Sequence, residues 1–206
     1  MLSKEKQSLT AIVLAGGQSS RMGQDKALLT IGNQSLLSYV CNVAQESANW
    51  VYIVAPWVKK YHHFAEHSSV SLVQESLIDP KAQSNCPLVG FYQGLEQVKT
   101  EWVLLLACDL PRLNSHEIKR WSESLNDLPQ DAIALLPRHA KGWEPLCGFY
   151  RSNCRASIQK YLEQGGRAFQ PWLRENRVVE WEICDRNMLF NCNTKDDWLE
   201  VKENKL

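Results

Sequence analysis

Short apolar segments rich in β-branched and aromatic residues alternate along the chain with segments whose apolar residues recur at helical spacing. The predicted strands are residues 11–14, 50–55, 70–73, 102–107, 132–136 and 178–183. Helical spacing is clear at Leu36, Val40 and Ala44. Near-continuous apolar strands separated by helices form a parallel sheet that helices cover on both faces. We therefore expect an α/β fold, a single three-layer domain over residues 1–206 with a mostly parallel central sheet flanked by helices, and a flexible segment at residues 1–9.

A glycine-rich run, LAGGQSSRMGQDK at residues 14–26, directly follows the first predicted strand. Glycine lets the backbone take unusual conformations and approach a ligand closely, so that successive amide groups converge on an anion. Arg21 can bind a phosphate through two parallel hydrogen bonds, and Lys26 adds a mobile point charge. The spacing fits neither G-x-G-x-x-G nor the P-loop. A solvated surface turn is the alternative, but two cations and two hydroxyl groups after a strand favour an anion site.

A second motif, LLLACDLPRL at residues 104–113, places Asp109 just beyond another buried strand. Ligands of open α/β sheets bind beyond the carboxyl ends of the strands. One carboxylate there can hold Mg²⁺, which keeps several waters and takes its other ligands from substrate phosphates. Asp109 could instead cap the following turn. Its pairing with a phosphate-type loop favours magnesium and phosphoryl chemistry.

Composition excludes several functional classes. Lysine plus arginine equals aspartate plus glutamate at 23 residues each, which argues against sequence-independent binding to nucleic acid or to a membrane surface. The seven cysteines are widely spaced and include no C-x-x-C pair, as is typical of reduced thiols in the cytoplasm. No apolar stretch approaches membrane-spanning length, and the amino-terminal residues lack the apolar centre of a signal peptide. We expect a soluble cytoplasmic protein.

Taken together, LAGGQSSRMGQDKALL and CDLPRL resemble the paired signatures of the molybdenum cofactor guanylyltransferases. Residues 87–90, PLVG, and residues 191–194, NCNT, are similar to two further elements of that family in the same order and at similar spacing. The opening motif is shared with a wider superfamily of nucleotidyltransferases. The resemblance implies a Rossmann-like fold of the nucleotide-diphospho-sugar transferase type.

The same resemblance implies a reaction. GMP is transferred from GTP to molybdenum-bound molybdopterin, and diphosphate is released. The pterin phosphate is already anionic at neutral pH and needs no general base, so positioning and charge neutralisation must supply most of the catalysis. The implied cofactor is Mg²⁺, the implied substrates are GTP and molybdopterin, and transient contacts with molybdenum-insertion enzymes are expected.

Site residues follow from the resemblance by matching position. The backbone of Leu14, Ala15 and Gly16 is expected to contact the guanine nucleotide, and Lys26 to bind its phosphates. Asp109 is expected to bind both nucleotide and magnesium, and Arg21 to steady the diphosphate. The resemblance thus assigns Arg21, Lys26 and Asp109 to catalysis.

The chain departs from the family pattern at several positions. Val54-Ala55-Pro56 stands where an asparagine often helps to read the nucleotide, and Glu75 stands for a usual aspartate, with Asp79 a less well aligned candidate. Asn191 and Asn193 could face the pterin or only satisfy a turn before a helix whose N-cap would be Thr194.

Other interpretations remain open at this point. A related enzyme could use CTP or act on a sugar phosphate, and a non-catalytic protein could have kept the fold to bind a nucleotide or hand over a cofactor. Trp143 could stack on the pterin or only pack its loop. Residues 78–87, polar and without periodicity, are expected to form a mobile loop.

Overall fold

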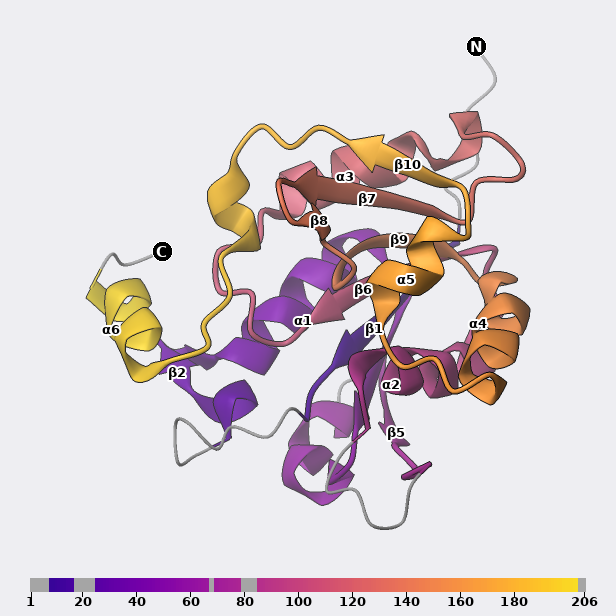
Figure 1. Cartoon of the computed structure of the whole chain (residues 1–206). Coiled ribbons are helices and arrows are strands. Elements are labelled where there is room, and N and C mark those ends of the chain that lie inside the picture. Colours follow the sequence, from indigo (N-terminus) through magenta and orange to yellow (C-terminus); the bar gives the residue numbers. More distant parts are fainter. Residues whose placement is uncertain (1–7, 17–24, 67–68, 79–84, 204–206) are drawn as a thin grey trace.

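The computed structural model describes residues 8–16, 25–66, 69–78 and 85–203 (Figure 1). One sheet with the strand order β10-β7-β9-β6-β1-β4-β5 forms its centre, and β8 pairs with β7 beside it. The strands of this sheet are β1 (Thr10–Leu14), β4 (Trp50–Ala55), β5 (Val70–Gln74), β6 (Trp102–Ala107), β7 (Ala134–His139), β8 (Gly142–Trp143), β9 (Cys147–Arg151) and β10 (Val178–Trp181). A separate antiparallel hairpin consists of β2 (Thr30–Ile31) and β3 (Gln34–Ser35).

The sheet is mostly parallel, and one strand is reversed. Strands β5, β4, β1 and β6 run parallel to one another, as do β7 and β10. Strand β9, which lies between β6 and β7, is antiparallel to both. Each predicted strand is present, but the sequence analysis did not predict β9. Because β9 is reversed, its amino end lies at the same edge of the sheet as the carboxyl ends of β6 and β7.

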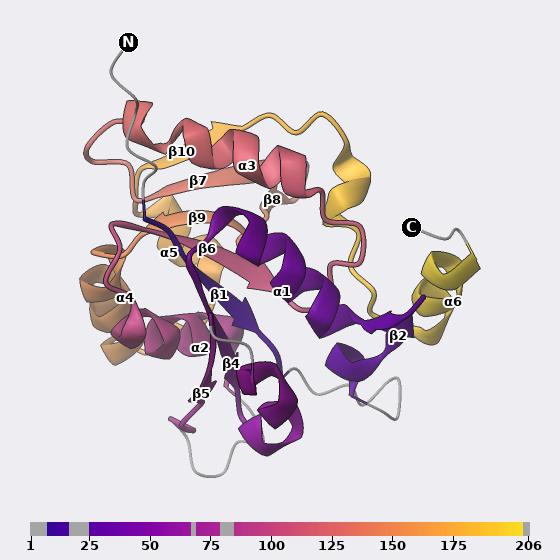
Figure 2. The same ribbon diagram turned by 180° about the vertical axis from the view of Figure 1, so that it is seen from behind.

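Helices cover both faces of the sheet, as expected for a three-layer α/β fold. The helices are α1 (Leu36–Ser47), α2 (Pro87–Gly94), α3 (Ser115–Glu123), α4 (Cys154–Glu163), α5 (Phe169–Arg174) and α6 (Lys195–Glu203). Short 3₁₀ helices are η1 (Lys26–Leu28), η2 (Val58–Glu66), η3 (Leu95–Gln97), η4 (Leu125–Asp127) and η5 (Arg186–Leu189). Figure 2 shows α1 and α3 over one face, and Figure 1 shows α2, α4 and α5 over the other.

Alternation along β1 explains why both faces are covered. Ala11 and Val13 belong to the apolar core beneath α1 and α3, whereas Ile12 belongs to the core beneath α2, α4 and α5. All three side chains have no exposed surface. A strand that is apolar at every position must be buried on both sides, which is the physical basis of the predicted layers.

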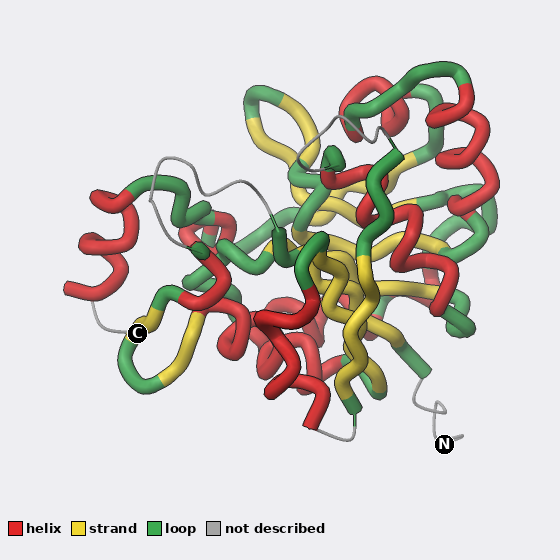
Figure 3. Tube along the Cα trace, turned by 90° about the horizontal axis from the view of Figure 1, so that it is seen from below, coloured by secondary structure: helices red, strands yellow, loops and turns green. Residues whose placement is uncertain are grey.

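Helix α6 and the β2–β3 hairpin lie outside these layers. They lie together at one side of the molecule, where Val201 packs with Ile31 and Cys192 (Figures 1 and 3). At the start of the described chain, Leu9 is buried and its carbonyl accepts a hydrogen bond from the Asn49 amide at 2.8 Å. Leu9 is therefore tied to the fold, while residues 1–7 lie outside the described ranges. None of the described helices combines the length and apolar character needed to cross a membrane.

Candidate active site

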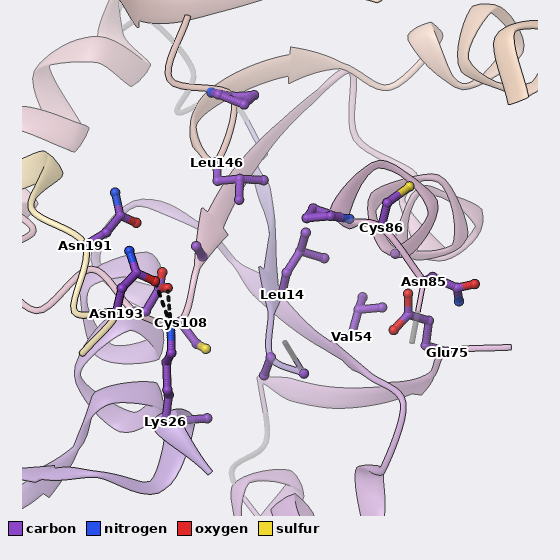
Figure 4. A pocket seen from close by; sticks show the side chains of 18 of the residues that line it. Leu14, Lys26, Val54, Glu75, Asn85, Cys86, Cys108, Leu146, Asn191 and Asn193 are labelled. Carbon is purple, nitrogen blue, oxygen red and sulfur yellow. Dashed lines mark hydrogen bonds and ion pairs between the residues drawn. The ribbon is translucent and has the colours of Figure 1, made fainter. Parts of the chain in front are cut away.

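A cavity of about 470 Å³ opens beyond the carboxyl ends of β1, β4 and β6. Figure 4 shows side chains from several distant chain segments around it. The lining residues are Leu14, Ala15, Gly16, Asp25, Lys26, Ala27, Val54, Glu75, Asn85, Cys86, Pro87, Gly90, Ala107, Cys108, Asp109, Glu144, Pro145, Leu146, Asn191 and Asn193. This is the edge at which α/β sheets bind ligands. The described residues among those predicted for the site, Leu14, Ala15, Gly16, Lys26, Glu75 and Asp109, all line this one cavity.

Lys26 and Asp109 lie next to each other in the cavity. The Lys26 ammonium lies 3.6 Å from Asp109 Oδ2, and about a fifth of each side chain is exposed (19% and 20%). Lys26 also donates a hydrogen bond of 2.7 Å to Asn193 Oδ1. The Cys192 amide donates to the Asp109 carbonyl at 2.9 Å. The loop after β1, the end of β6 and the segment before α6 therefore meet at one point.

Asp25 fixes the start of η1 just before Lys26. Its Oδ1 accepts a hydrogen bond from the Ala27 amide at 3.2 Å, which caps the short helix. Its Oδ2 accepts a hydrogen bond of 3.0 Å from the hydroxyl of Tyr61, and Lys60 Nζ lies 3.4 Å from the same oxygen. Burial, together with the nearby Asp25 charge, raises the pKa of Tyr61 far above its ordinary value. The sequence analysis did not predict these contacts of Asp25 with Tyr61 and Lys60 of η2.

The surroundings of Asp109 suit a metal cation. Burial raises the pKa of its carboxyl group, and the nearby Lys26 ammonium only partly opposes that rise. A partly desolvated carboxylate is stabilised by a nearby cation. Among the described residues, no group of three or more His, Cys, Asp or Glu side chains could hold a metal on its own. A single carboxylate fits Mg²⁺, which takes its remaining ligands from water and phosphate oxygens.

The turn after β1 is shaped by Gly16. Its φ is +156°, and a Cβ atom added there would lie 2.1 Å from Pro56 Cδ. Only glycine fits this close approach. The Ala15 amide donates to the Val54 carbonyl at 2.9 Å, and the Leu14 carbonyl accepts from the Cys108 amide at 3.1 Å. The backbone contacts predicted between this turn and a nucleotide cannot use the Ala15 amide, whereas the Leu14 carbonyl keeps a second lone pair. Residues 17–24, Arg21 among them, lie outside the described ranges.

Glu75 lies on another side of the cavity, directly after β5 (Figure 4). Its amide donates to the Ala55 carbonyl at 2.8 Å, and its Oε1 would lie 3.1 Å from a Cβ atom placed on Gly90. Burial raises the pKa of Glu75, and a hydrogen bond with Asn85 partly counters this. Figure 4 shows Glu75 and Asn85 on one side of Leu14, with Lys26 on the opposite side.

The structure describes only the two ends of the loop predicted at residues 78–87. Pro87 does not belong to a loop, because it occupies the first turn of α2, where a missing amide hydrogen carries no cost. The Ile78 amide donates to Asn85 Oδ1 at 3.0 Å, and Asn85 Nδ2 donates to the Ser76 carbonyl at 2.8 Å. The Asn85 side chain therefore joins the segment after β5 to the segment before α2. Residues 79–84, including Asp79, lie outside the described chain.

Asn191 and Asn193 both line the cavity, and Asn191 Nδ2 also donates to the Leu189 carbonyl at 3.1 Å. Thr194 caps α6 as predicted, since its Oγ1 accepts from the Asp197 amide at 3.1 Å and Asp197 Oδ2 accepts from the Thr194 amide at 2.7 Å. This reciprocal capping fixes the chain just after Asn193. The side chain of Asn193 is then free to face Lys26.

A further wall of the cavity consists of Glu144, Pro145 and Leu146, which the sequence analysis missed. These residues lead into β9, and the reversed direction of that strand brings them to the ligand-binding edge. Trp143 does not line the cavity. It is held by Gln170, whose Oε1 accepts from the Trp143 amide at 3.2 Å and whose Nε2 donates to the Trp143 carbonyl at 2.6 Å. The Trp143 ring packs against the core beneath α2, α4 and α5 and lies 5.1 Å from the Arg138 guanidinium, which favours packing of its loop over stacking on a pterin.

The chain is similar in sequence to known nucleotidyltransferases. Residues 11–178 match the MobA-like NTP transferase domain. A protein of Trichormus variabilis described as a probable molybdenum cofactor guanylyltransferase is 52% identical over 190 residues, which cover 92% of this chain and 88% of that protein.

Two solved structures share the fold. The molybdopterin-guanine dinucleotide biosynthesis protein A of Archaeoglobus fulgidus has a TM-score of 0.75 at 19% identity, with 95% of this chain and 97% of that chain covered. A Mycobacterium tuberculosis protein in complex with manganese has a TM-score of 0.64 at 16% identity, with 96% and 99% covered. The match over most of the sequence and the 52% identical relative establish that this chain belongs to the MobA-like NTP transferase family of nucleotidyltransferases.

Proposed function

We propose that this chain transfers GMP from GTP to the terminal phosphate of molybdenum-bound molybdopterin, forming the guanine dinucleotide cofactor and diphosphate. The relative that is 52% identical is described as a probable enzyme of this kind. The observation that carries the proposal is the Lys26 ammonium 3.6 Å from the largely buried Asp109 carboxylate, in a cavity at the ligand-binding edge of the sheet. A cation and a metal-binding carboxylate at one point are what transfer between phosphates requires.

The reaction needs little from the protein beyond position and charge. An oxygen of the acceptor phosphate attacks the α-phosphorus of GTP, and the bond from that phosphorus to the β-phosphate oxygen breaks. Lys26 neutralises the negative charge that develops on the diphosphate. Asp109 would hold the divalent cation, which lowers the repulsion between the two anionic substrates. Arg21 is assigned to the leaving diphosphate because of its place in the glycine-rich run.

Glu75 is the candidate for reading guanine. Guanine presents a ring N–H and an amino group side by side, and one carboxylate can accept hydrogen bonds from both. Cytosine presents an amino group beside a ring acceptor, which a carboxylate would repel. Glu75 lines the cavity away from Lys26 and is desolvated, which strengthens such hydrogen bonds. A carboxylate placed to accept from the ring N–H of guanine rejects cytosine, because cytosine has no hydrogen at the corresponding ring nitrogen.

The test is product formation from molybdenum-bound molybdopterin with GTP, CTP, ATP or UTP at varied magnesium concentration. We expect turnover with GTP, whereas turnover with CTP alone would overturn the guanylyl assignment. Asp109→Asn keeps the size of the side chain and removes its charge, so it should abolish magnesium-dependent turnover and leave cooperative thermal unfolding intact. Asp131→Asn is the matched control, because Asp131 is exposed and pairs with Arg177 before β7, at the other edge of the sheet. Full activity of Asp109→Asn would refute the assigned role.

Two further assignments belong to this proposal. All seven cysteines are unpaired thiols, which supports a reducing compartment, and we place the reaction in the cytoplasm. Transient contacts with molybdenum-insertion enzymes stay a prediction, which cross-linking of the folded chain to such enzymes would test.

A further inference from the structure

A histidine and a glutamate form a bonded pair in the wall of the cavity that leads into β9. His139 Nε2 lies 2.6 Å from Glu144 Oε1. His139 is the last residue of β7, and its Nδ1 accepts a hydrogen bond of 2.9 Å from the Lys141 amide. An imidazole whose Nδ1 accepts must carry its proton on Nε2. His139 therefore donates to Glu144 even when the ring is neutral, and this fixes one oxygen of the carboxylate.

The backbone around Glu144 is held on every side. The Glu144 amide donates to the Pro137 carbonyl at 2.9 Å, and the Leu146 carbonyl accepts from the Ala107 amide at 2.9 Å. Between them, the Pro145 carbonyl accepts a 2.7 Å hydrogen bond from the hydroxyl of the fully buried Tyr150. A carboxylate on such a support is preorganised, since neither its backbone nor its rotamer has to be ordered when a ligand binds.

Charge limits what this carboxylate can face. Both substrates of the proposed reaction are polyanions, so an additional carboxylate beside their phosphates would weaken binding. Asp109 and Asp25 are neutralised by Lys26 and Lys60. Glu144 has the His139 imidazole as its partner, and among the described residues no other side chain is bonded to it. Its second oxygen and the remaining lone pair of Oε1 are therefore suited to the adjacent N–H donors of an uncharged heterocycle.

We propose that Glu144, positioned by His139, binds the pterin of the acceptor by accepting hydrogen bonds from its ring N–H and amino group. This inference rests on the proposed function. Guanine and pterin carry the same 2-amino-4-oxopyrimidine edge, so a carboxylate can recognise either heterocycle in the same way. The cavity supplies Glu75 and Glu144. Leu146, two residues after Glu144, lies on a different side of Leu14 from Glu75 (Figure 4). Glu75 follows β5 and Glu144 precedes β9, and three strands, β6, β1 and β4, lie between these two in the sheet, so one carboxylate is available to each heterocycle.

Glu144→Gln tests the assignment, because the amide keeps the shape and replaces one acceptor atom with a donor. One N–H of the pterin then meets an N–H group. We expect the KM for molybdopterin to rise about tenfold to a hundredfold, with kcat at saturation and the KM for GTP changed less than about twofold. Glu75→Gln is the matched variant and should show the reverse pattern. Asp131→Asn should change neither constant.

A binding assay without turnover tests pterin binding by Glu144 independently of the proposed GMP transfer. The fluorescence anisotropy of 6-(phosphooxymethyl)pterin reports pterin binding, and equilibrium dialysis reports GTP binding. Glu144→Gln should weaken only the first. Unchanged pterin affinity in this variant would overturn the inference, and so would a loss confined to GTP, which would make Glu144 the guanine-binding residue. Wild-type protein that binds pterin through Glu144 but makes no product from GTP would contradict the proposed function alone.

His139 is a positioning residue, and its variants distinguish this role from a purely structural one. His139→Ala removes the donor to Glu144, so we expect the KM for molybdopterin to rise by about fivefold at unchanged kcat. His139→Gln keeps a side-chain N–H donor and should recover most of the affinity. Equal KM values for the two variants, or a fall in kcat with KM unchanged, would refute the positioning role. Thermal unfolding of each variant shows that the fold is kept.

Discussion

Replacement of Gly16 by alanine tests whether close backbone packing shapes the nucleotide site. A Cβ atom at this position would lie 2.1 Å from Pro56 Cδ and 2.9 Å from Pro56 Cγ. Ordinary contact starts at 3.4 Å, so the turn after β1 or Pro56 must move by about 1.3 Å. The backbone also has φ of +156°, which side-chain-bearing residues avoid. Both the fold and the position of the glycine-rich run are therefore affected.

The expected cost can be assembled from two contributions. Holding alanine in an unfavourable backbone conformation costs about 1–3 kcal/mol. Forcing an added methyl group into a packed site costs about 1–3 kcal/mol. The lower entropy of the unfolded alanine chain offsets about 0.4–1 kcal/mol of this. We expect a net loss of about 1–5.6 kcal/mol in the free energy of unfolding, a large fraction of the 5–15 kcal/mol that typically stabilises a domain. A displacement of about 1 Å at the site should also lower kcat/KM by about a hundredfold.

Gly32→Ala is the matched control. Gly32 has φ of +61°, and nothing lies within 4 Å of an added Cβ atom, so only the conformational cost remains, about 1–2 kcal/mol. Urea denaturation measures both variants, and equilibrium dialysis measures their affinity for GTP. Adding Pro56→Ala to Gly16→Ala removes the clashing Cδ and Cγ atoms and should restore part of the lost stability. If Gly16→Ala were as stable as Gly32→Ala and bound GTP as tightly as the wild type, the steric argument would be wrong.

Two other changes have defined outcomes. Burial raises the pKa of Glu75 above its unfolded value, so the folded chain binds this proton more tightly and the ionised carboxylate destabilises the fold at neutral pH. Glu75→Gln should therefore raise Tm at pH 7, with the gain shrinking as pH falls and lost well below about 4, where the carboxyl is protonated in both states. A Tm gain independent of pH would contradict this. Asn193→Ala removes the acceptor of the 2.7 Å hydrogen bond from Lys26, so kcat/KM for GTP should fall about fivefold while Tm changes little. Unchanged kinetics would show that Asn193 does not position Lys26.

The sequence predicted the positions of the strands but not the direction of all of them. Apolar runs such as residues 102–107 are buried on both faces, and that requirement is visible in composition. Direction depends on the connections. The tight turn at residues 140–141 reverses the chain between His139 and Gly142, and β9 then enters the sheet antiparallel. His139 and Glu144 could not be assigned to the site until that reversal was known.

The candidate site was predictable where functional residues directly follow strands. Lys26 and Asp109 stand beyond the ends of β1 and β6, and the sheet brings those ends together. Tyr61 gave no such signal, because a tyrosine between lysines and histidines has no distinctive pattern. Its bond to Asp25 arises from the packing of η2 against the loop before Lys26. Contacts that arise when distant segments pack together cannot be predicted from the residue pattern within either segment.

The bond between Lys26 and Asn193 joins residues 167 positions apart in the chain. Contacts of such long separation form late in folding, because the entropy of closing a long loop must be overcome before they add stability. Helices and adjacent parallel strands can form first, whereas Lys26 obtains its partner only after the final segment docks beside Asp109. In a refolding experiment, recovery of GTP binding should therefore lag behind recovery of helical circular dichroism. The site would report the completion of folding.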